Sequence, residues 1–180
     1  MDVSRLRKKL HKFDRSAVTL LVEEYKTPLL RFAFSFVRDE RIAEDVVSEA
    51  LVRLLIKKPR LRSEGALKGY LFSVTKNVAV DYLRKQKREK AYSARLGQEE
   101  REKRAKPIEN SVIENERYRE VTEALSGLNE RYREALYLQY FEEMSVEDIA
   151  KIMGGSKKQT YNLLARAKAA MKEILKEGEE

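Results

Sequence analysis

Residues 145–165 read SVEDIAKIMGGSKKQTYNLLA and decide the fold of the C-terminal half of the chain. The stretch contains two capping boxes, beginning at Ser145 and Ser156, in which a hydroxyl group and a residue three positions later satisfy the free amides of a helix start. Gly154-Gly155 lies between the boxes and permits a short turn. Two helices joined in this way meet at a steep angle, so the pattern predicts a helix-turn-helix.

The second helix of such a motif lies in the major groove of DNA, where lysine reaches guanine acceptors and asparagine reads adenine. We expect the two helices to be held together by Ile149, Ala150, Met153, Thr160 and Leu163. The residues expected to face DNA are Ser156, Lys157, Lys158, Tyr161, Asn162 and Arg166. The alternative is an ordinary helical hairpin with a solvated basic face, because capping boxes and glycine turns occur in many bundles.

Apolar residues recur every three or four positions in three segments of the first half of the chain, residues 18–36, 42–54 and 67–82. This spacing keeps the apolar side chains on one face and predicts three helices. Pro28 should kink the first helix or mark a second start. The second helix should end before Pro59, because the residue preceding a proline disfavours helical backbone.

A stretch dense in charge separates two apolar parts of the chain. From Arg84 to about residue 111 large apolar residues are few, so the stretch cannot bury enough surface to order itself, although its helix formers could extend the preceding helix. Apolar periodicity returns over residues 113–140, where Asn129 is a plausible cap. We therefore predict an all-α protein of two small helical domains joined by a charged linker: a bundle over residues 10–88, a linker over 89–111 and a helix-turn-helix domain over 112–176.

The composition limits the functions that the chain can have. A formal net charge of +8 over 180 residues favours a polyanionic partner, since lysine and arginine release condensed counterions from nucleic acid. There is no cysteine, and the single histidine, His11, has no partners for a catalytic or zinc site. We therefore expect no enzymatic activity, no metal and no cofactor. No apolar run matches a signal peptide or a membrane span, so we expect a cytoplasmic protein without membrane insertion.

A second basic cluster follows the predicted helix over residues 67–82. It consists of Arg84, Lys85, Lys87 and Arg88, and Tyr70, Phe72 and Tyr82 lie nearby in the sequence. Basic residues next to aromatic rings can follow phosphates and stack bases. Basic residues at a helix C-terminus also complement the helix dipole, and aromatic residues at helical spacing are often core, so both interpretations stay open.

Three segments resemble the extracytoplasmic-function group of bacterial sigma factors. They are Ala43–Ala50, Tyr70–Asn77 with Asp81 and Arg84, and Leu128 with Arg131–Arg133 ahead of the helix-turn-helix. The resemblance extends from about residue 18 to residue 175, in the same order and with the linker in the same place. It implies a protein that binds core RNA polymerase, recognises promoter DNA and promotes strand opening at transcription initiation.

The resemblance implies a role for each candidate face. The helix carrying Asp45, Ser48, Glu49 and Val52 would dock on the coiled coil of the polymerase β′ subunit. Its acidic side chains, in a basic protein, suit a basic partner surface, whereas without the resemblance a solvated helix face is the favoured alternative. Lys76 and Asn77, with the loop over residues 57–65, would hold a flipped base of the minus-ten element, while Arg84, Lys85, Lys87 and Arg88 bind phosphates. The alternative for Asn77 is a structural cap or a hydrogen bond in the core. The helix-turn-helix would read the minus-thirty-five element. The polymerase β flap and an anti-sigma factor are further partners that the family implies.

The sequence departs from the family at two places. Tyr70 replaces a frequent tryptophan, and KQTYNL over residues 158–163 replaces a frequent Gly-Thr-Val-Lys-Ser-Arg stretch, so the promoter sequence does not follow from the resemblance. Two other functions remain as alternatives. A DNA-binding regulator that never docks on polymerase would not need Asp45 or Glu49, and a helical interaction module would bind DNA weakly and without sequence preference.

Overall fold

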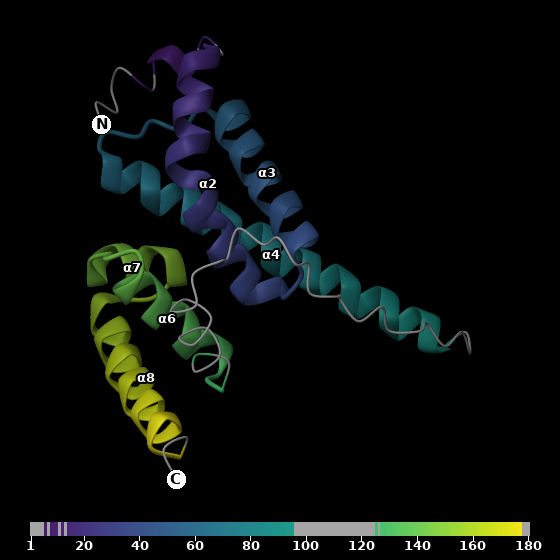
Figure 1. The fold of residues 1–180 in the computed structure, drawn as a ribbon, viewed down its shortest axis with the longest axis vertical. Coiled ribbons are helices and arrows are strands. Elements are labelled where there is room, and N and C mark those ends of the chain that lie inside the picture. Colours follow the sequence, from purple (N-terminus) through teal and green to yellow (C-terminus); the bar gives the residue numbers. More distant parts are fainter. Residues whose placement is uncertain are drawn as a thin grey trace.

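The computed structural model describes residues 6, 8–10, 12, 14–95, 125 and 127–177. Within these ranges the regular structure is entirely helical, which confirms the all-α prediction (Figure 1). The helices are α2 (Arg15–Val37), α3 (Glu40–Lys57), α4 (Glu64–Arg95), α6 (Glu130–Tyr140), α7 (Val146–Met153) and α8 (Lys157–Glu177). Of the predicted linker, residues 89–95 belong to α4, and residues 96–111 lie outside the described residues, as do residues 112–124.

Helices α2, α3 and α4 pack on one another and form the N-terminal bundle. The carboxylate of Asp14 caps α2 by accepting a hydrogen bond from the Ser16 amide at 2.9 Å. One continuous helix runs through Pro28, so the second start considered there does not occur. Proline removes one backbone donor, and the burial of Tyr25, Leu29 and Phe32 on the same helix outweighs that loss.

The boundaries of α3 and α4 follow from local chemistry. Asp39 accepts a hydrogen bond from the Ile42 amide at 3.1 Å and caps α3. Lys58 adopts the left-handed conformation with a φ of 46°, directly before Pro59, so the predicted end of this helix is confirmed. The hydroxyl group of Ser63 accepts a hydrogen bond from the Ala66 amide at 3.1 Å and starts α4.

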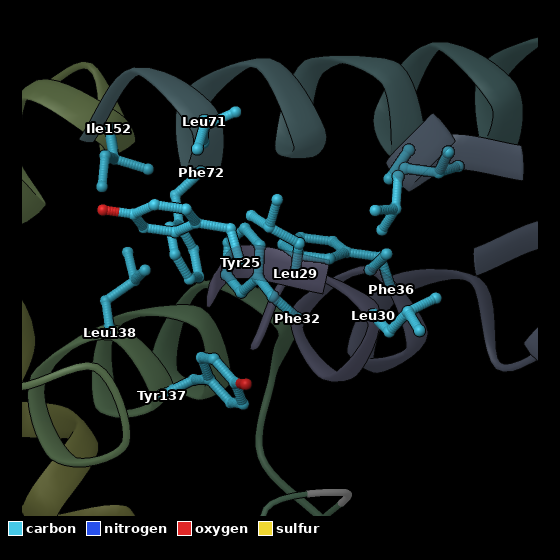
Figure 2. Close-up of a cluster of buried hydrophobic side chains, with 14 of the residues drawn as sticks. Tyr25, Leu29, Leu30, Phe32, Phe36, Leu71, Phe72, Tyr137, Leu138 and Ile152 are labelled. Atoms are coloured by element: carbon cyan, nitrogen blue, oxygen red, sulfur yellow. The ribbon is translucent and has the colours of Figure 1, made fainter. Parts of the chain in front are cut away.

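Aromatic side chains form the centre of the N-terminal bundle (Figure 2). The Phe32 ring lies 5.1 Å from the Phe36 ring and 5.0 Å from the Phe72 ring, measured between centroids. Phe32 and Phe72 are both fully buried. The structure therefore makes Phe72 a core residue and contradicts the base-stacking role considered for it.

Helices α6, α7 and α8 contact one another and form the C-terminal unit. Leu138 and Ile149 are fully buried at its centre. Leu164, not Leu163, is the buried leucine of α8, because Leu164 lies four residues after buried Thr160 and therefore on the same face of the helix. Leu163 is only partly buried, which corrects the anchor predicted from the sequence.

The C-terminal unit packs against the N-terminal bundle, a contact that the sequence did not reveal. Helix α7 contacts α4, and α6 contacts α2. Figure 2 shows Tyr137, Leu138 and Ile152 of the C-terminal unit beside Tyr25 and Phe72 of the bundle. The buried side chains of both units thus belong to one continuous apolar core.

Candidate nucleic-acid interface

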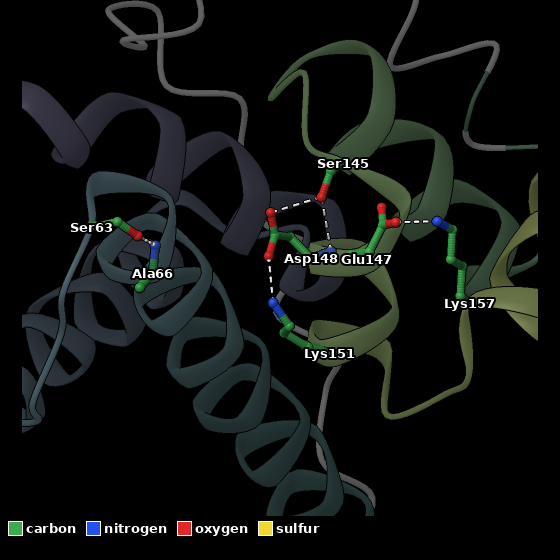
Figure 3. Close-up of polar contacts among 7 residues, drawn as sticks. All are labelled: Ser63, Ala66, Ser145, Glu147, Asp148, Lys151 and Lys157. Atoms are coloured by element: carbon green, nitrogen blue, oxygen red, sulfur yellow. Dashed lines mark hydrogen bonds and ion pairs between the residues drawn. The ribbon is translucent and has the colours of Figure 1, made fainter.

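The capping box at Ser156 is confirmed, and the Ser145 hydroxyl caps α7 as predicted, but Asp148 binds that hydroxyl and not the Ser145 amide. At the start of α7, the Asp148 amide donates to the Ser145 hydroxyl at 3.2 Å, and that hydroxyl donates to the Asp148 carboxylate at 2.8 Å (Figure 3). At the start of α8, the Gln159 amide donates to the Ser156 hydroxyl at 3.2 Å, and the Gln159 side chain accepts from the Ser156 amide at 2.8 Å. These hydrogen bonds fix the first turn of each helix of the motif.

The turn between α7 and α8 depends on Gly154. Its φ of 68° is left-handed, and its amide donates to the Ala150 carbonyl and ends α7. A side chain at this position would be strained, since residues other than glycine rarely adopt this conformation. Thr160, 2% exposed, then holds α8 against the unit, with its hydroxyl donating to the Ser156 carbonyl at 3.1 Å.

The face of α8 opposite Thr160 is open to solvent. All six predicted DNA-facing residues are exposed: Lys158, Tyr161, Asn162 and Arg166 on this face, and Ser156 and Lys157 at the start of the helix, nearer the side of Thr160. Lys157 pairs with Glu147 of α7 (Figure 3). Its Nζ also lies 5.9 Å from the centroid of the Tyr161 ring. The hydrogen bond between Lys157 and Glu147 raises the pKa of Lys157 and lowers the pKa of Glu147. Lys157 therefore holds the two helices of the motif together as well as adding positive charge to this face.

A second exposed basic surface lies at the end of α4, which projects past the N-terminal bundle (Figure 1). It consists of the predicted residues Arg84, Lys85, Lys87 and Arg88, all exposed. Two of them make loose surface ion pairs, Arg84 with Asp81 at 3.6 Å and Lys85 with Glu89 at 3.9 Å. Such pairs contribute about 0–1 kcal/mol, so contacts with phosphate can readily replace them.

The sequence interpretation did not include Tyr92, whose ring is 66% exposed in the projecting end of α4. It follows Arg88 by four residues and therefore lies on the same helical face, one turn further on. This spacing was visible in the sequence. A basic residue and an exposed ring on one face suit a nucleic-acid strand.

The neighbouring candidates Lys76 and Asn77 differ in accessibility. Asn77 is exposed, whereas the Lys76 side chain is 20% exposed and its Nζ lies 2.7 Å from Oε1 of Glu134 in the C-terminal unit. The Glu134 side chain is 3% exposed. Burial raises the pKa of Glu134, and the positive charge of Lys76 opposes that increase. One candidate DNA residue is thus covered by an acidic side chain of the same chain.

The acidic face of α3 forms the third surface. Its predicted residues Asp45, Ser48, Glu49 and Val52 are all exposed, opposite the buried Val46, Val47 and Ala50. Arg53 donates to the Glu49 carboxylate at 2.8 Å. Ile56, 69% exposed, lies one turn beyond Val52 and extends the face with a second apolar side chain that the sequence interpretation omitted. Acidic and apolar groups side by side are typical of a protein interface rather than a DNA surface.

Comparison with known sequence families gives the two units their identity. Residues 21–89 match Sigma-70 region 2, and residues 118–171 match Sigma-70, region 4. The chain belongs to the extracytoplasmic-function group of sigma factors. The sigma factor is 29% identical to the ECF RNA polymerase sigma factor SigM of Bacillus subtilis over 162 residues, which cover 88% of this chain and 94% of SigM. It is 27% identical to SigV of the same organism, covering 88% of this chain and 90% of SigV.

Solved structures agree with this fold. The sigma factor resembles RpoE of Bartonella quintana, solved in complex with the anti-sigma factor NepR, with a TM-score of 0.65 and 27% identity, covering 87% of this chain and 96% of RpoE. CnrH, solved with the cytosolic domain of CnrY, has a TM-score of 0.66 and 22% identity over 95% of both chains. The likeness to CnrH shows the fold alone.

The family establishes the function: this sigma factor binds RNA polymerase and promoter DNA for transcription initiation. Within the described ranges, no helix combines the length and the apolar character that crossing a membrane requires.

Proposed function

We propose that this sigma factor joins polymerase to its promoter through three separate surfaces, without catalysing a reaction, in the cytoplasm. The exposed face of α3 binds the coiled coil of the β′ subunit. The end of α4, with Lys76 and Asn77, binds the minus-ten element and promotes strand opening, and the exposed face of α8 binds the minus-thirty-five element. The predicted division into a bundle over residues 10–88 and a helix-turn-helix domain over 112–176 underlies this assignment.

The separation of charge supports the proposal most directly. The chain carries a net charge of +8, yet Asp45 and Glu49 lie together on an exposed face of α3 beside Val52 and Ile56. Carboxylates repel phosphate, so this face suits a positively charged protein surface with apolar contacts. The basic side chains needed for DNA lie on other helices, at the end of α4 and along α8.

The two DNA surfaces differ in the chemistry that they offer. On α8, Lys158 and Asn162 are exposed at positions four residues apart, so they project from one face and can reach base edges in a major groove. On α4, the basic residues and Tyr92 offer phosphate contacts and a ring for an unpaired base, as a melted segment requires.

The proposal includes two further protein partners. The relative RpoE is solved in complex with the anti-sigma factor NepR, and we extend an anti-sigma partner to this chain by that likeness. The β flap of polymerase would bind the C-terminal unit, where Tyr140 and Leu175 are exposed apolar side chains, 60% and 52% accessible.

The experiment that tests the α3 surface is a charge reversal at Asp45→Lys together with Glu49→Lys. The matched control is Glu23→Lys with Glu24→Lys, which makes the same charge change at exposed positions of α2. Removing complementary charges at an interface costs a few kcal/mol, so we expect affinity for core polymerase to fall at least about tenfold in the α3 variant. Binding of both variants to promoter duplex should not fall. Equal core binding by the α3 variant and its control would refute the assignment and favour a DNA-binding regulator that acts away from polymerase.

A further inference from the structure

An aromatic ring lies exposed on the part of the helix-turn-helix that the proposed function assigns to DNA. Tyr161 of α8 is 53% exposed, whereas its neighbour Thr160 is 2% exposed and belongs to the buried side of the helix. Single exposed rings are common on protein surfaces, so exposure alone does not indicate a role. The surroundings of this ring do.

The side chain beside Tyr161 is tied to the other helix of the motif. Lys157, one turn earlier on α8, has its Nζ 5.9 Å from the centroid of the Tyr161 ring. A cation within about 6 Å of a ring centroid is attracted to the ring. The same Nζ is bound by the carboxylate of Glu147 on α7 (Figure 3). The lysine side chain is flexible by itself, so this bond to α7 fixes the cation against which the ring lies.

The ion pair persists at neutral pH and adds little stability of its own. Its hydrogen bond raises the pKa of Lys157 and lowers the pKa of Glu147, so both groups stay charged. Both side chains are about half exposed, at 55% and 51%, and exposed ion pairs contribute little to folding. The consequence of this pair is therefore the position that it gives to Lys157 and to the ring beside it.

The ring is the large apolar group of a face that is otherwise polar or small. Among the described residues of α8, the exposed large apolar side chains are Tyr161 and Leu175, and Leu175 lies near the other end of the helix. Lys158 and Asn162 are exposed next to Tyr161 and carry hydrogen-bonding groups. Ala165, one turn after Tyr161, is exposed and carries only a methyl group, which leaves the ring uncovered on that side.

The major groove offers one apolar group to such a ring. The edges of the base pairs present hydrogen-bond donors and acceptors, and thymine adds the methyl group on its C5 atom. Cytosine carries a hydrogen atom at this place. An apolar ring therefore gains affinity by covering the thymine methyl group, which a lysine or asparagine head group cannot do.

We propose that Tyr161 contacts the methyl group of a thymine in the minus-thirty-five element, and that Glu147 and Lys157 are positioning residues that hold the ring for this contact. The inference rests on the proposed binding of α8 to that element and assigns one base of it to one residue. The thymine lies close to the base that Asn162 contacts, because Tyr161 and Asn162 are adjacent on α8.

The test uses uracil, which pairs with adenine as thymine does and lacks only the methyl group. The full chain, bound to core polymerase, first selects its minus-thirty-five element from a promoter library randomised there. Each thymine of the selected duplex is then replaced by uracil, one at a time, and the affinity of the holoenzyme is measured. At one thymine, uracil should weaken binding about fourfold, the factor that corresponds to the ~0.8 kcal/mol of one buried methyl group.

Variants at Tyr161 show whether its ring makes the contact. Tyr161→Ala should bind the thymine and uracil duplexes equally at that position, and Tyr161→Phe should keep the preference for thymine. A preference that persists in Tyr161→Ala would assign the methyl group to another residue and overturn the proposal. A parent holoenzyme that binds every uracil duplex as tightly as the unmodified one would overturn it as well.

Glu147→Gln tests the positioning role. It removes the charge that holds Lys157, so the ratio of thymine to uracil affinity at that position should fall toward one. The matched control is Glu173→Gln, which makes the same charge change and breaks another exposed ion pair of α8, with Lys176. The control should keep the parent ratio, and because each ratio compares two duplexes on one protein, the altered net charge cancels. A pair with a merely structural role would weaken binding to both duplexes equally, and an unchanged ratio in Glu147→Gln would refute the positioning of the ring.

Initiation separates the failure of this inference from the failure of the proposed function. A holoenzyme that selects a minus-thirty-five element and initiates from it, yet is indifferent to uracil, would refute the role of Tyr161 alone. A parent chain that binds no core polymerase, or that selects no sequence at the minus-thirty-five position, would refute the proposed function instead.

Discussion

Replacing Leu164 by alanine should destabilise the C-terminal unit far more than the same replacement at Leu163. Leu164 is 3% exposed and lies on the α8 face that packs inside the unit, whereas Leu163 is partly exposed. Truncating a fully buried leucine costs about 2–5 kcal/mol through lost burial and the remaining cavity. At a half-buried site the cavity is open to water, so we expect roughly 1 kcal/mol for Leu163→Ala.

The two positions make a matched pair. They are adjacent on one helix, and both substitutions change helix propensity identically, so the difference of at least about 1–2 kcal/mol reports burial alone. The measurement is urea unfolding of the full chain, followed by circular dichroism and fitted for the free energy of unfolding. Binding to a minus-thirty-five duplex at a temperature where both variants are folded should be preserved. If Leu163→Ala lowers the free energy of unfolding as much as Leu164→Ala does, Leu164 does not face the core of the unit. The exposed face of α8 assigned to DNA would then be wrong as well.

Three further predictions concern the DNA surfaces and the contact between the units. Ser156→Ala removes the cap of α8 and should lower the free energy of unfolding by about 1 kcal/mol. The variant should bind the minus-thirty-five element more weakly without a change in sequence preference. An unchanged free energy of unfolding would contradict the capping role. Lys87→Ala should reduce the slope of log affinity for promoter DNA against log salt by about 1, and an unaltered slope would show that Lys87 does not touch phosphate. The pKa of Glu134 is raised by burial against the charge of Lys76, with Glu130 raising it and Arg131 lowering it, so folding takes up a proton. The free energy of unfolding of the full chain should therefore contain a contribution from Glu134 that is fully present below the ordinary value of 4.5 and is lost as the pH rises through the raised pKa. Glu134→Gln, which cannot titrate, should remove this dependence, and its persistence in that variant would refute the assignment.

The sequence predicted the helices well because their limits are set by local chemistry. Caps such as Ser145 and Ser156 and the stop at Pro59 act within one turn of their own position, and the structure keeps all three. The exposed candidates on α3 and α8 were predictable for the same reason, since helical spacing alone separates them from the core.

Adjacent apolar residues were harder to assign. Leu163 and Leu164 fit a helical pattern almost equally, and only the buried Thr160 one turn earlier selects Leu164. In α6 the apolar periodicity that extends to residue 140 suggests that Tyr140 faces the core, but Tyr140 is 60% exposed, and the Nζ of Lys168 lies 5.4 Å from the centroid of its ring. The buried stretch of α6 runs from Glu134 to Leu138, and it includes Tyr137 and Leu138 because α6 faces both its own unit and the N-terminal bundle.

The contact between the units could not be read from the sequence at all. Glu134 stands in a segment rich in charge, where a carboxylate ordinarily marks the solvent face of a helix. Its partner Lys76 lies in another helix and carries no pattern that points to α6. Interactions of this kind depend on how complete helices are placed in space, and local propensity does not encode that placement.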